Sequence, residues 1–409
     1  MTLSRAMRSL PAAWWATVVL FLVHGLVVGT WVSRIPAIQS ALHLNNGVLG
    51  MTLLSSAVGA VCTIPVTSWL LGRFGSRKVT GASSLAFCLA VALPGLAGNA
   101  AALAVALFVF GALASAMDVS MNTHGVEVEK LLGRPTMSRF HAMFSLGAMG
   151  GAGLGGWVAG EHIRPLVHFM AAGLIAFGAV SGVLALLLKT QRHAAAKAKW
   201  RLRKIPRVLL ALSAIGFCIL LAEGAMADWT AIYLHQVLHA GPTVAAEGYA
   251  AFAAAMALFR LAGDFITARL GPRRTVCVGS VLAATGLLFA LAVSGPLWAF
   301  PGFVATGAGL SVIIPLVFGG GGRVPSVEPG AGIATVTGLG YIGFILGPPA
   351  IGLTAQVSSL RYALGIVVGC CLASALLSRE MQSLEPKPLG PQFVEPQLNL
   401  LEPQNPAGG

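Results

Sequence analysis

Residues 218–234 read Cys-Ile-Leu-Leu-Ala-Glu-Gly-Ala-Met-Ala-Asp-Trp-Thr-Ala-Ile-Tyr-Leu. This run is apolar enough to cross a bilayer, yet it carries two carboxylates, Glu223 and Asp228. A charge at mid-membrane costs a few kcal/mol or more, so both groups are expected to face protein or water instead of lipid. Five residues at about 100° each place the two groups about 140° apart around a helix. The run therefore predicts a membrane helix within a bundle, with Glu223 near its middle and Asp228 nearer one end.

The rest of the chain has the same character. Of its 409 residues, 56% are hydrophobic and 10% are charged, whereas soluble domains carry about 25% charged residues. The six cysteines lie in apolar runs without a C-x-x-C pattern, so neither a disulfide framework nor a metal site is predicted. Spans need roughly 17–25 apolar residues. Twelve segments qualify: about 13–35, 47–71, 78–97, 100–124, 140–160, 166–188, 207–234, 244–268, 275–293, 296–318, 330–354 and 358–378.

The basic residues fix the expected orientation. With the N-terminus inside, all lysines and arginines except Arg34, Arg164, Arg260 and Arg361 fall in cytoplasmic segments. This is the positive-inside pattern of a multi-pass protein in a bacterial-type inner membrane, with both termini cytoplasmic. It also explains the net charge of +13 as scattered loop anchors, which excludes a nucleic-acid partner.

Sequence repeats divide the chain into two halves. Arg73-Phe-Gly75-Ser-Arg77-Lys78 recurs as Arg269-Leu-Gly271-Pro-Arg273-Arg274, each after the second span of its half. Six spans per half give both halves the same orientation, as in parallel repeats. We predict an all-α membrane protein of twelve helices in two pseudo-symmetric six-helix bundles. The expected domains are 1–188, a basic cytoplasmic linker 189–206, 207–378, and a disordered Pro-rich cytoplasmic tail 379–409.

Two glycine strings sit inside predicted spans. Gly151-x-Gly153-x-x-Gly156 lies in the fifth span and a matching string begins at Gly338 in the eleventh. A dinucleotide-binding loop would follow a strand in water, so no cofactor is expected. Gly147, Gly151 and Gly155 recur every four residues, which favours close contact between helices.

Twelve spans, paired halves and the repeated basic loop resemble the major facilitator superfamily over about residues 13–378. The family loop pattern, G-x-L-x-D-R-x-G-R-R, is matched at Arg73, Gly75, Arg77 and Lys78, but Gly72 stands at the acidic position. The resemblance implies that Asp264, with Arg269, Gly271 and Arg273, supplies the acidic latch in the second half. Motifs in four segments resemble the MosC/YbjJ-like branch, which is related to fucose:proton symporters: Trp31-Val-Ser-Arg34-Ile-Pro36, Asp118-x-x-x-Asn122, Phe140-His141 and Glu223-Gly-Ala-Met-Ala-Asp228-Trp229.

The fourth span carries the clearest polar stripe. Gly111, Ser115, Asp118, Asn122 and Gly125 follow one another at spacings of four and three, which place them on one helical face. Such a stripe is typical of a cavity lining. By resemblance to the fucose-type symporters, Asp118 takes the coupling proton and Asn122 is its hydrogen-bonding partner. The alternative is that Asp118 pairs with His141 or Arg139.

Glu223 is the second candidate for proton coupling, with an interhelical clamp as its alternative role. Asp228 is expected near the outer end, where it could form a latch with Arg34, and Arg260 has Asp264 four residues later as an ordinary helix ion pair. The substrate-cavity candidates are Asn122, Ser115, His24, Arg34, His141 and Asp228.

Together these features predict a secondary active transporter, expected as a monomer, whose partners are a small polar solute, protons and the lipid bilayer. It would move a sugar, cyclitol or amine-like solute by alternating access and would be proton-coupled. A drug or metabolite:proton efflux antiporter and a non-transporting membrane sensor remain alternatives. An enzyme is not expected, because the sequence has no metal-ligand spacing and no nucleophile elbow.

Overall fold

The computed structural model describes residues 3–134, 136–188, 205–325 and 327–384. Every regular element within these ranges is a helix. The predicted linker 189–206 lies outside the described residues except for its last two, and the predicted tail lies outside them beyond residue 384. The first residues of the predicted tail are ordered, because Ser378–Leu384 forms a 3-10 helix (η3) whose Met381 is buried against the second half.

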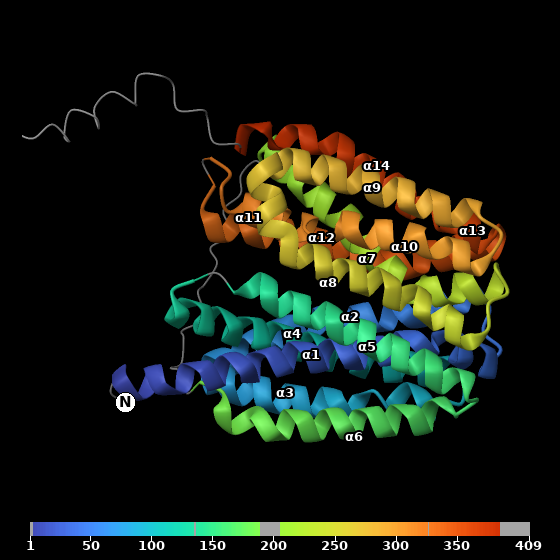
Figure 1. The fold of residues 1–409 in the computed structure, drawn as a ribbon, viewed down its shortest axis with the longest axis horizontal. Coiled ribbons are helices and arrows are strands. Elements are labelled where there is room, and N and C mark those ends of the chain that lie inside the picture. The colour runs from blue at the N-terminus through green and yellow to red at the C-terminus, as the bar shows by residue number, and fades with distance from the viewer. Residues whose placement is uncertain (1–2, 135, 189–204, 326, 385–409) are drawn as a thin grey trace, which may run out of the picture.

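The first half forms one bundle, blue to green in Figure 1. Its helices are α1 (Leu3–Ala41), α2 (Asn46–Phe74), α3 (Ser76–Ala90), α4 (Ala100–Leu132), α5 (Met137–Gly160) and α6 (Pro165–Val183), with short 3-10 turns η1 (Leu93–Leu96) and η2 (Leu184–Leu186).

The second half forms the other bundle, yellow-green to red in Figure 1. Its helices are α7 (Arg207–Gln236), α8 (Pro242–Leu270), α9 (Pro272–Ala292), α10 (Pro296–Leu310), α11 (Ile313–Gly321), α12 (Pro329–Val357), α13 (Leu360–Ala363) and α14 (Gly365–Leu377). Two predicted spans are each broken into successive helices: α10 with α11, and α13 with α14. Eleven crossings within the described residues are long and apolar enough to span a membrane. The twelfth is α5, whose 24 residues include the glycine string that lowers its hydropathy.

Glycine ridges join equivalent helix pairs in the two halves. A Cβ on Gly147 or Gly151 of α5 would strike the backbone carbonyl of Leu22 or Leu26 in α1. In the second half, a Cβ on Gly343 of α12 would strike the carbonyl of Phe217 in α7. The helices approach this closely because no side chain separates them, as the glycine spacing predicts.

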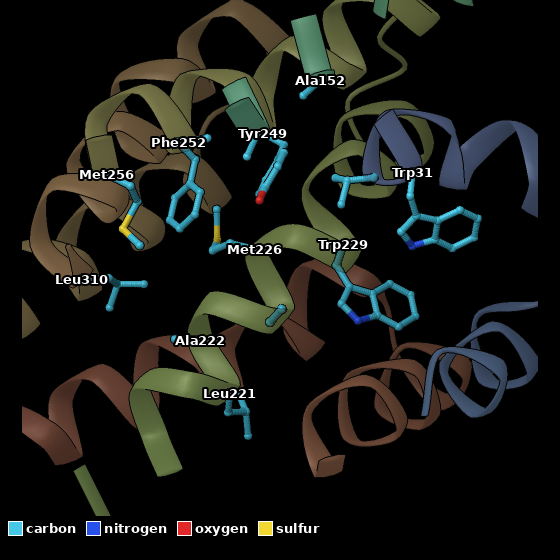
Figure 2. Packing of buried hydrophobic residues seen from close by; sticks show 14 of the residues in the cluster. Trp31, Ala152, Leu221, Ala222, Met226, Trp229, Tyr249, Phe252, Met256 and Leu310 are labelled. Carbon is cyan, nitrogen blue, oxygen red and sulfur yellow. The ribbon is translucent and has the colours of Figure 1, made fainter. Parts of the chain in front are cut away.

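Buried apolar side chains of both bundles form a continuous core. Figure 2 shows Met226 and Trp229 of α7 in one cluster with Tyr249 and Phe252 of α8, and Trp31 of α1 belongs to the same cluster. Trp229 is fully buried, and α7 packs against α8 and α12 of its own bundle and against α1 of the other.

The repeated basic loops have the same backbone conformation. Gly75 has φ 80° and ψ 161°, and Gly271 has φ 78° and ψ 156°, each joining two helices. This region of backbone space is almost closed to residues with a Cβ. The repeated glycine is therefore required by the turn between α2 and α3 and by the turn between α8 and α9.

Replacing Gly75 or Gly271 with Ala is expected to lower the free energy of unfolding by about 1–3 kcal/mol, because the Cβ strains the turn. Thermal unfolding of the purified protein in detergent measures the loss. Gly98→Ala is the matched control, since a Cβ there meets nothing within 4 Å and its φ is not positive. Equal melting temperatures for all three variants would contradict the assignment.

The bundles touch at the end opposite the basic loops. We call the end that carries Arg73, Arg77, Lys78, Arg269 and Arg273 the basic end, and the opposite one the far end. At the far end, Gln236 of α7 donates to Gln39 of α1 at 3.0 Å, and the backbone of Gly47 donates to Gln356 of α12 at 3.5 Å. Gly50 of α2 and Gly352 of α12 are so close that a Cβ on Gly352 would lie 2.9 Å from the Cα of Gly50. These contacts close the far end.

Candidate functional site

A cavity of about 520 Å³ lies between the bundles. Met137 and Ser138 at the start of α5, Thr267 near the end of α8, and Phe318 near the end of α11 place it toward the basic end. It is therefore reached from the basic end while the far end is closed. Its full lining is Asp118, Val119, Asn122, Met137, Ser138, His141, Arg260, Gly263, Asp264, Thr267, Ser311, Val312, Ile314, Pro315, Leu316, Phe318 and Tyr341.

Asp118 and Asn122 line this cavity from α4. The Asn122 amide donates to Oδ1 of Asp118 at 3.0 Å and to its backbone carbonyl at 2.8 Å. Neither Arg139 nor His141 is an ion-pair or hydrogen-bond partner of Asp118 among the described residues. The second carboxylate oxygen thus remains available to a proton or a solute.

The remainder of the predicted stripe has a packing role. A Cβ on Gly111 would strike the carbonyl of Ser56 in α2, and Gly125 lies against Met137 and Phe140 of α5. Ser115 does not belong to the cavity lining. Only the middle of the stripe faces the cavity, because its two ends are where α4 meets neighbouring helices.

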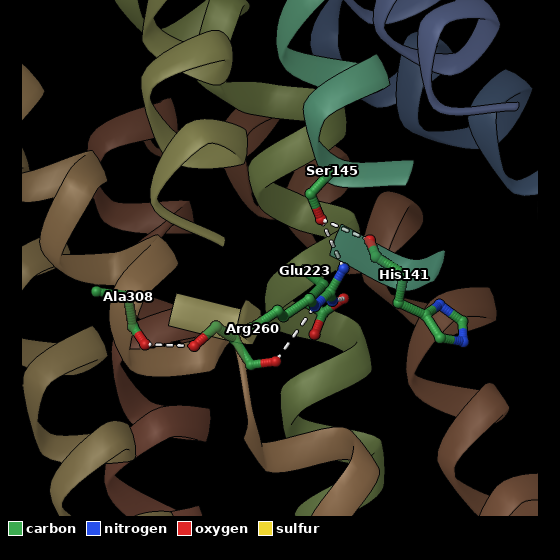
Figure 3. A network of polar contacts seen from close by, with 6 residues as sticks. His141, Ser145, Glu223, Arg260 and Ala308 are labelled. Atoms are coloured by element: carbon green, nitrogen blue, oxygen red, sulfur yellow. Dashed lines mark hydrogen bonds and ion pairs between the residues drawn. The ribbon is translucent and has the colours of Figure 1, made fainter. Parts of the chain in front are cut away.

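Arg260 is the hub of a polar network (Figure 3). Its Nη2 lies 3.5 Å from Oε2 of Glu223, its Nε donates to the carbonyl of Ser311 at 3.2 Å, and its Nη1 donates to Oγ of Ser145 at 2.8 Å. Ser145 belongs to α5, so this last bond crosses between bundles. The expected ion pair between Arg260 and Asp264 was wrong: Arg260 pairs with Glu223, and Asp264 lies in the cavity lining without an ion pair among the described residues.

The two intramembrane histidines of the prediction differ in position. His141 lines the cavity and makes an edge contact with Phe21, with ring centroids 5.3 Å apart. His24 is 6% exposed and lies between Phe87 and Phe144, at centroid distances of 5.1 and 5.2 Å. His24 is therefore outside the cavity lining, packed among aromatic rings.

The expected latch between Arg34 and Asp228 was wrong. Arg34 is 3% exposed and donates from Nη2 to the carbonyl of Ile163 at 2.5 Å, which ties α1 to the loop after α5. Asp228 has no hydrogen bond or ion pair among the described residues, and neither residue lines the cavity. Arg34 is thus bound to a backbone carbonyl of its own bundle instead of a carboxylate of α7.

Basic side chains of the loop motif contact groups of their own bundle. Arg77 donates to the carbonyl of Ala185 at 3.2 Å, which fastens the start of α3 to η2. Next to it, Ser76 donates to Glu127 of α4 at 2.8 Å, and the same hydroxyl lies 3.1 Å from Nδ1 of His124. Glu127 of α4 thus supplies an acidic hydrogen-bond acceptor to the first loop, in which position 72 is a glycine. Arg73 stacks on Trp69, and Arg269 lies 4.3 Å from the ring centroid of Phe265, while Lys78 is exposed.

Sequence reasoning missed several lining residues. Ser311 and Tyr341 are isolated polar residues in apolar runs, and Ser138 lies in the polar loop end of its span, so no periodicity singles them out. Ser145 was missed for the same reason. Arg260 was assigned to the wrong partner. A cation inside a span usually pairs with an acid inside another span, and this rule would have favoured Glu223.

The sequence as a whole decides the family. Residues 13–319 match the profile of the Major Facilitator Superfamily. The chain belongs to this superfamily. An uncharacterized MFS-type transporter of Yersinia pestis is 34% identical over 360 residues, covering 88% of this chain and 93% of its own length. Membrane protein MosC of Rhizobium meliloti is 29% identical over 375 residues, covering 90% of each chain.

Solved structures share the fold of this superfamily member. A D-xylose-proton symporter has a TM-score of 0.71 at 11% identity, over 90% of this chain and 96% of its own. The fucose:proton symporter FucP of E. coli has a TM-score of 0.59 at 16% identity, over 90% and 98%. The predicted family, its MosC-like branch and the fold of two six-helix bundles are confirmed. The chain is a multi-pass membrane protein of a transporter family.

Proposed function

We propose that this superfamily member is a proton-coupled secondary transporter that binds a small polar solute between its bundles. The observation that carries the proposal is the cavity between bundles, which Asp118 and Asp264 line from opposite halves. A volume of about 520 Å³ is in the range of small-molecule sites. The symporters of D-xylose and fucose with the same fold make sugars, cyclitols and amine-like relatives the first solutes to test.

Two acids carry the proposed proton coupling. Asp118 has a single side-chain partner, the neutral amide of Asn122. Glu223 has one long contact with Arg260, and its Oε1 has no partner among the described residues. Acids inside a membrane protein that lack full compensation are typical proton carriers. We place the basic end in the cytoplasm by the positive-inside rule, so the arrangement described is inward-facing.

An efflux antiporter for apolar drugs or metabolites is the second candidate. It is favoured by the lining itself, in which Met137, Val312, Ile314, Leu316 and Phe318 surround the few polar groups. Both candidates use alternating access, and they differ in the solute bound and in the direction of net flux.

Transport assays separate the candidates. Purified protein is first screened for thermal stabilisation by D-xylose, L-fucose, myo-inositol, simple amines and the dye ethidium. The solute that stabilises is then followed in proteoliposomes under an imposed pH gradient of either sign. A polar solute accumulated against its gradient on the alkaline side supports symport, and dye accumulated on the acidic side supports efflux. Binding without flux in either direction would contradict transport and favour a sensor.

A further inference from the structure

The guanidinium of Arg260 donates hydrogen bonds to acceptors in both bundles. Glu223 on α7 and Ser311 after α10 belong to the same bundle as Arg260, whereas Ser145 on α5 belongs to the other one. A rigid rotation of one bundle against the other therefore changes the distance from Arg260 to Ser145. The same rotation leaves Arg260 and Glu223 together.

The pair between Arg260 and Glu223 is incomplete in the arrangement described. Its one contact is 3.5 Å long, whereas charge-assisted hydrogen bonds of this kind are about 2.7–2.9 Å and are often bidentate. Nη1, the nitrogen that a bidentate pair would add, is held by Ser145 at 2.8 Å. Oε1 of Glu223 is buried and has no partner among the described residues. Figure 3 shows that Ser145 and Glu223 approach the same guanidinium.

We propose that Ser145 is a positioning residue that links the protonation of Glu223 to the position of the bundles by competing for Arg260. While Ser145 holds Nη1, the carboxylate of Glu223 is poorly compensated and its protonated form is favoured. When the bundles rotate and Ser145 withdraws, both terminal nitrogens of Arg260 can turn to Glu223, and the carboxylate is favoured. Because such coupling is reciprocal, protonation of Glu223 favours the arrangement in which the basic end is open.

Other groups also face this pair and must be held constant. Tyr249 on α8 and Tyr341 on α12 lie within electrostatic range of Glu223, and His141 on α5 lies within range of Arg260. On the cavity side Asp118 acts on Tyr341, and Asp228 on α7 acts on Tyr249. A Ser145 variant leaves all of these side chains in place, so a change in the titration of Glu223 reports on the hydroxyl alone.

The test uses infrared spectroscopy of the full-length protein in liposomes and requires no solute. The C=O stretch of protonated carboxyl groups is followed against pH, and the part that disappears in Glu223→Gln is assigned to Glu223. We expect Ser145→Ala to move the midpoint of this signal by about one pH unit toward acid, the effect of one hydrogen bond to a charged group. Ser145→Thr, which keeps the hydroxyl, is expected to titrate like the wild type.

Ser181→Ala is the matched control, since Ser181 is an exposed helical serine on α6 that bonds only to the carbonyl of Phe177. Ser145→Gly removes the same hydroxyl within a glycine-rich helix and gives a second reading if the alanine variant is poorly folded. An unchanged midpoint in both variants, or an equal shift in Ser145→Thr, would overturn the inference. It rests on the proposed function, and the two can fail separately: absent proton-driven flux in the wild type defeats the function, while the infrared midpoints decide the role of Ser145.

Discussion

Asp118→Asn is expected to abolish accumulation of the solute against its gradient while leaving downhill exchange across the membrane. The substitution keeps the shape of the side chain and its place beside Asn122, but it removes the group that exchanges a proton. Because a transporter that cannot bind the coupling proton can only equilibrate its solute, the final inside and outside concentrations should become equal. Uptake into proteoliposomes, with and without a pH gradient, measures both activities.

Glu161→Gln serves as the control for this variant, because Glu161 is an exposed acid at the far end of α5, away from the cavity. It should accumulate solute like the wild type. If Asp118→Asn still accumulates solute as the wild type does, Asp118 is not the coupling group, and Glu223 becomes the remaining acid of the proposed pair.

Gly352→Leu is expected to slow transport by roughly fivefold or more by opening the far end. A Cβ at this position already lies 2.6 Å from the carbonyl of Asn46 and 2.9 Å from the Cα of Gly50, so the larger side chain cannot fit in the closed contact. Overpacking typically costs about 1–3 kcal/mol. About 1.4 kcal/mol is a factor of ten in an equilibrium constant. The equilibrium constant for closing the far end should therefore decrease by a factor of roughly five at the low end of this cost and more than about a hundred at the high end. Each transport cycle must pass through the state in which the far end is closed.

Flux and thiol labelling together measure this effect. In a background without native cysteines, a cysteine at Ser138 in the cavity lining should react more slowly with a membrane-impermeant reagent applied at the basic end, because that end closes as the far end opens. Gly369→Leu on α14 is the control, as a Cβ there meets nothing within 4 Å. Unchanged flux and labelling in Gly352→Leu would mean that α2 and α12 are not the far-end seal.

Local patterns were sufficient for much of the architecture. Hydropathy located the crossings, because a helix that spans lipid must be apolar along its whole length. The recurrence of Gly75 and Gly271 signalled two equivalent halves, and both residues have the positive φ that requires glycine. Asp118 and Asn122, four residues apart on one helix, were correctly placed together, because the helical repeat alone brings them into contact.

The partners between helices were decided only by the tertiary structure. Arg260 lies four residues from Asp264 in sequence, yet it pairs with Glu223 of α7 and donates to Ser145 of the other bundle. Likewise, the carboxylate that accepts a hydrogen bond from Ser76 belongs to Glu127, 51 residues away. The sequence determines which residues share a face of one helix, because that depends on a fixed repeat. Which faces meet, and at what depth, depends on how all the helices pack together, and no single stretch of sequence contains that information.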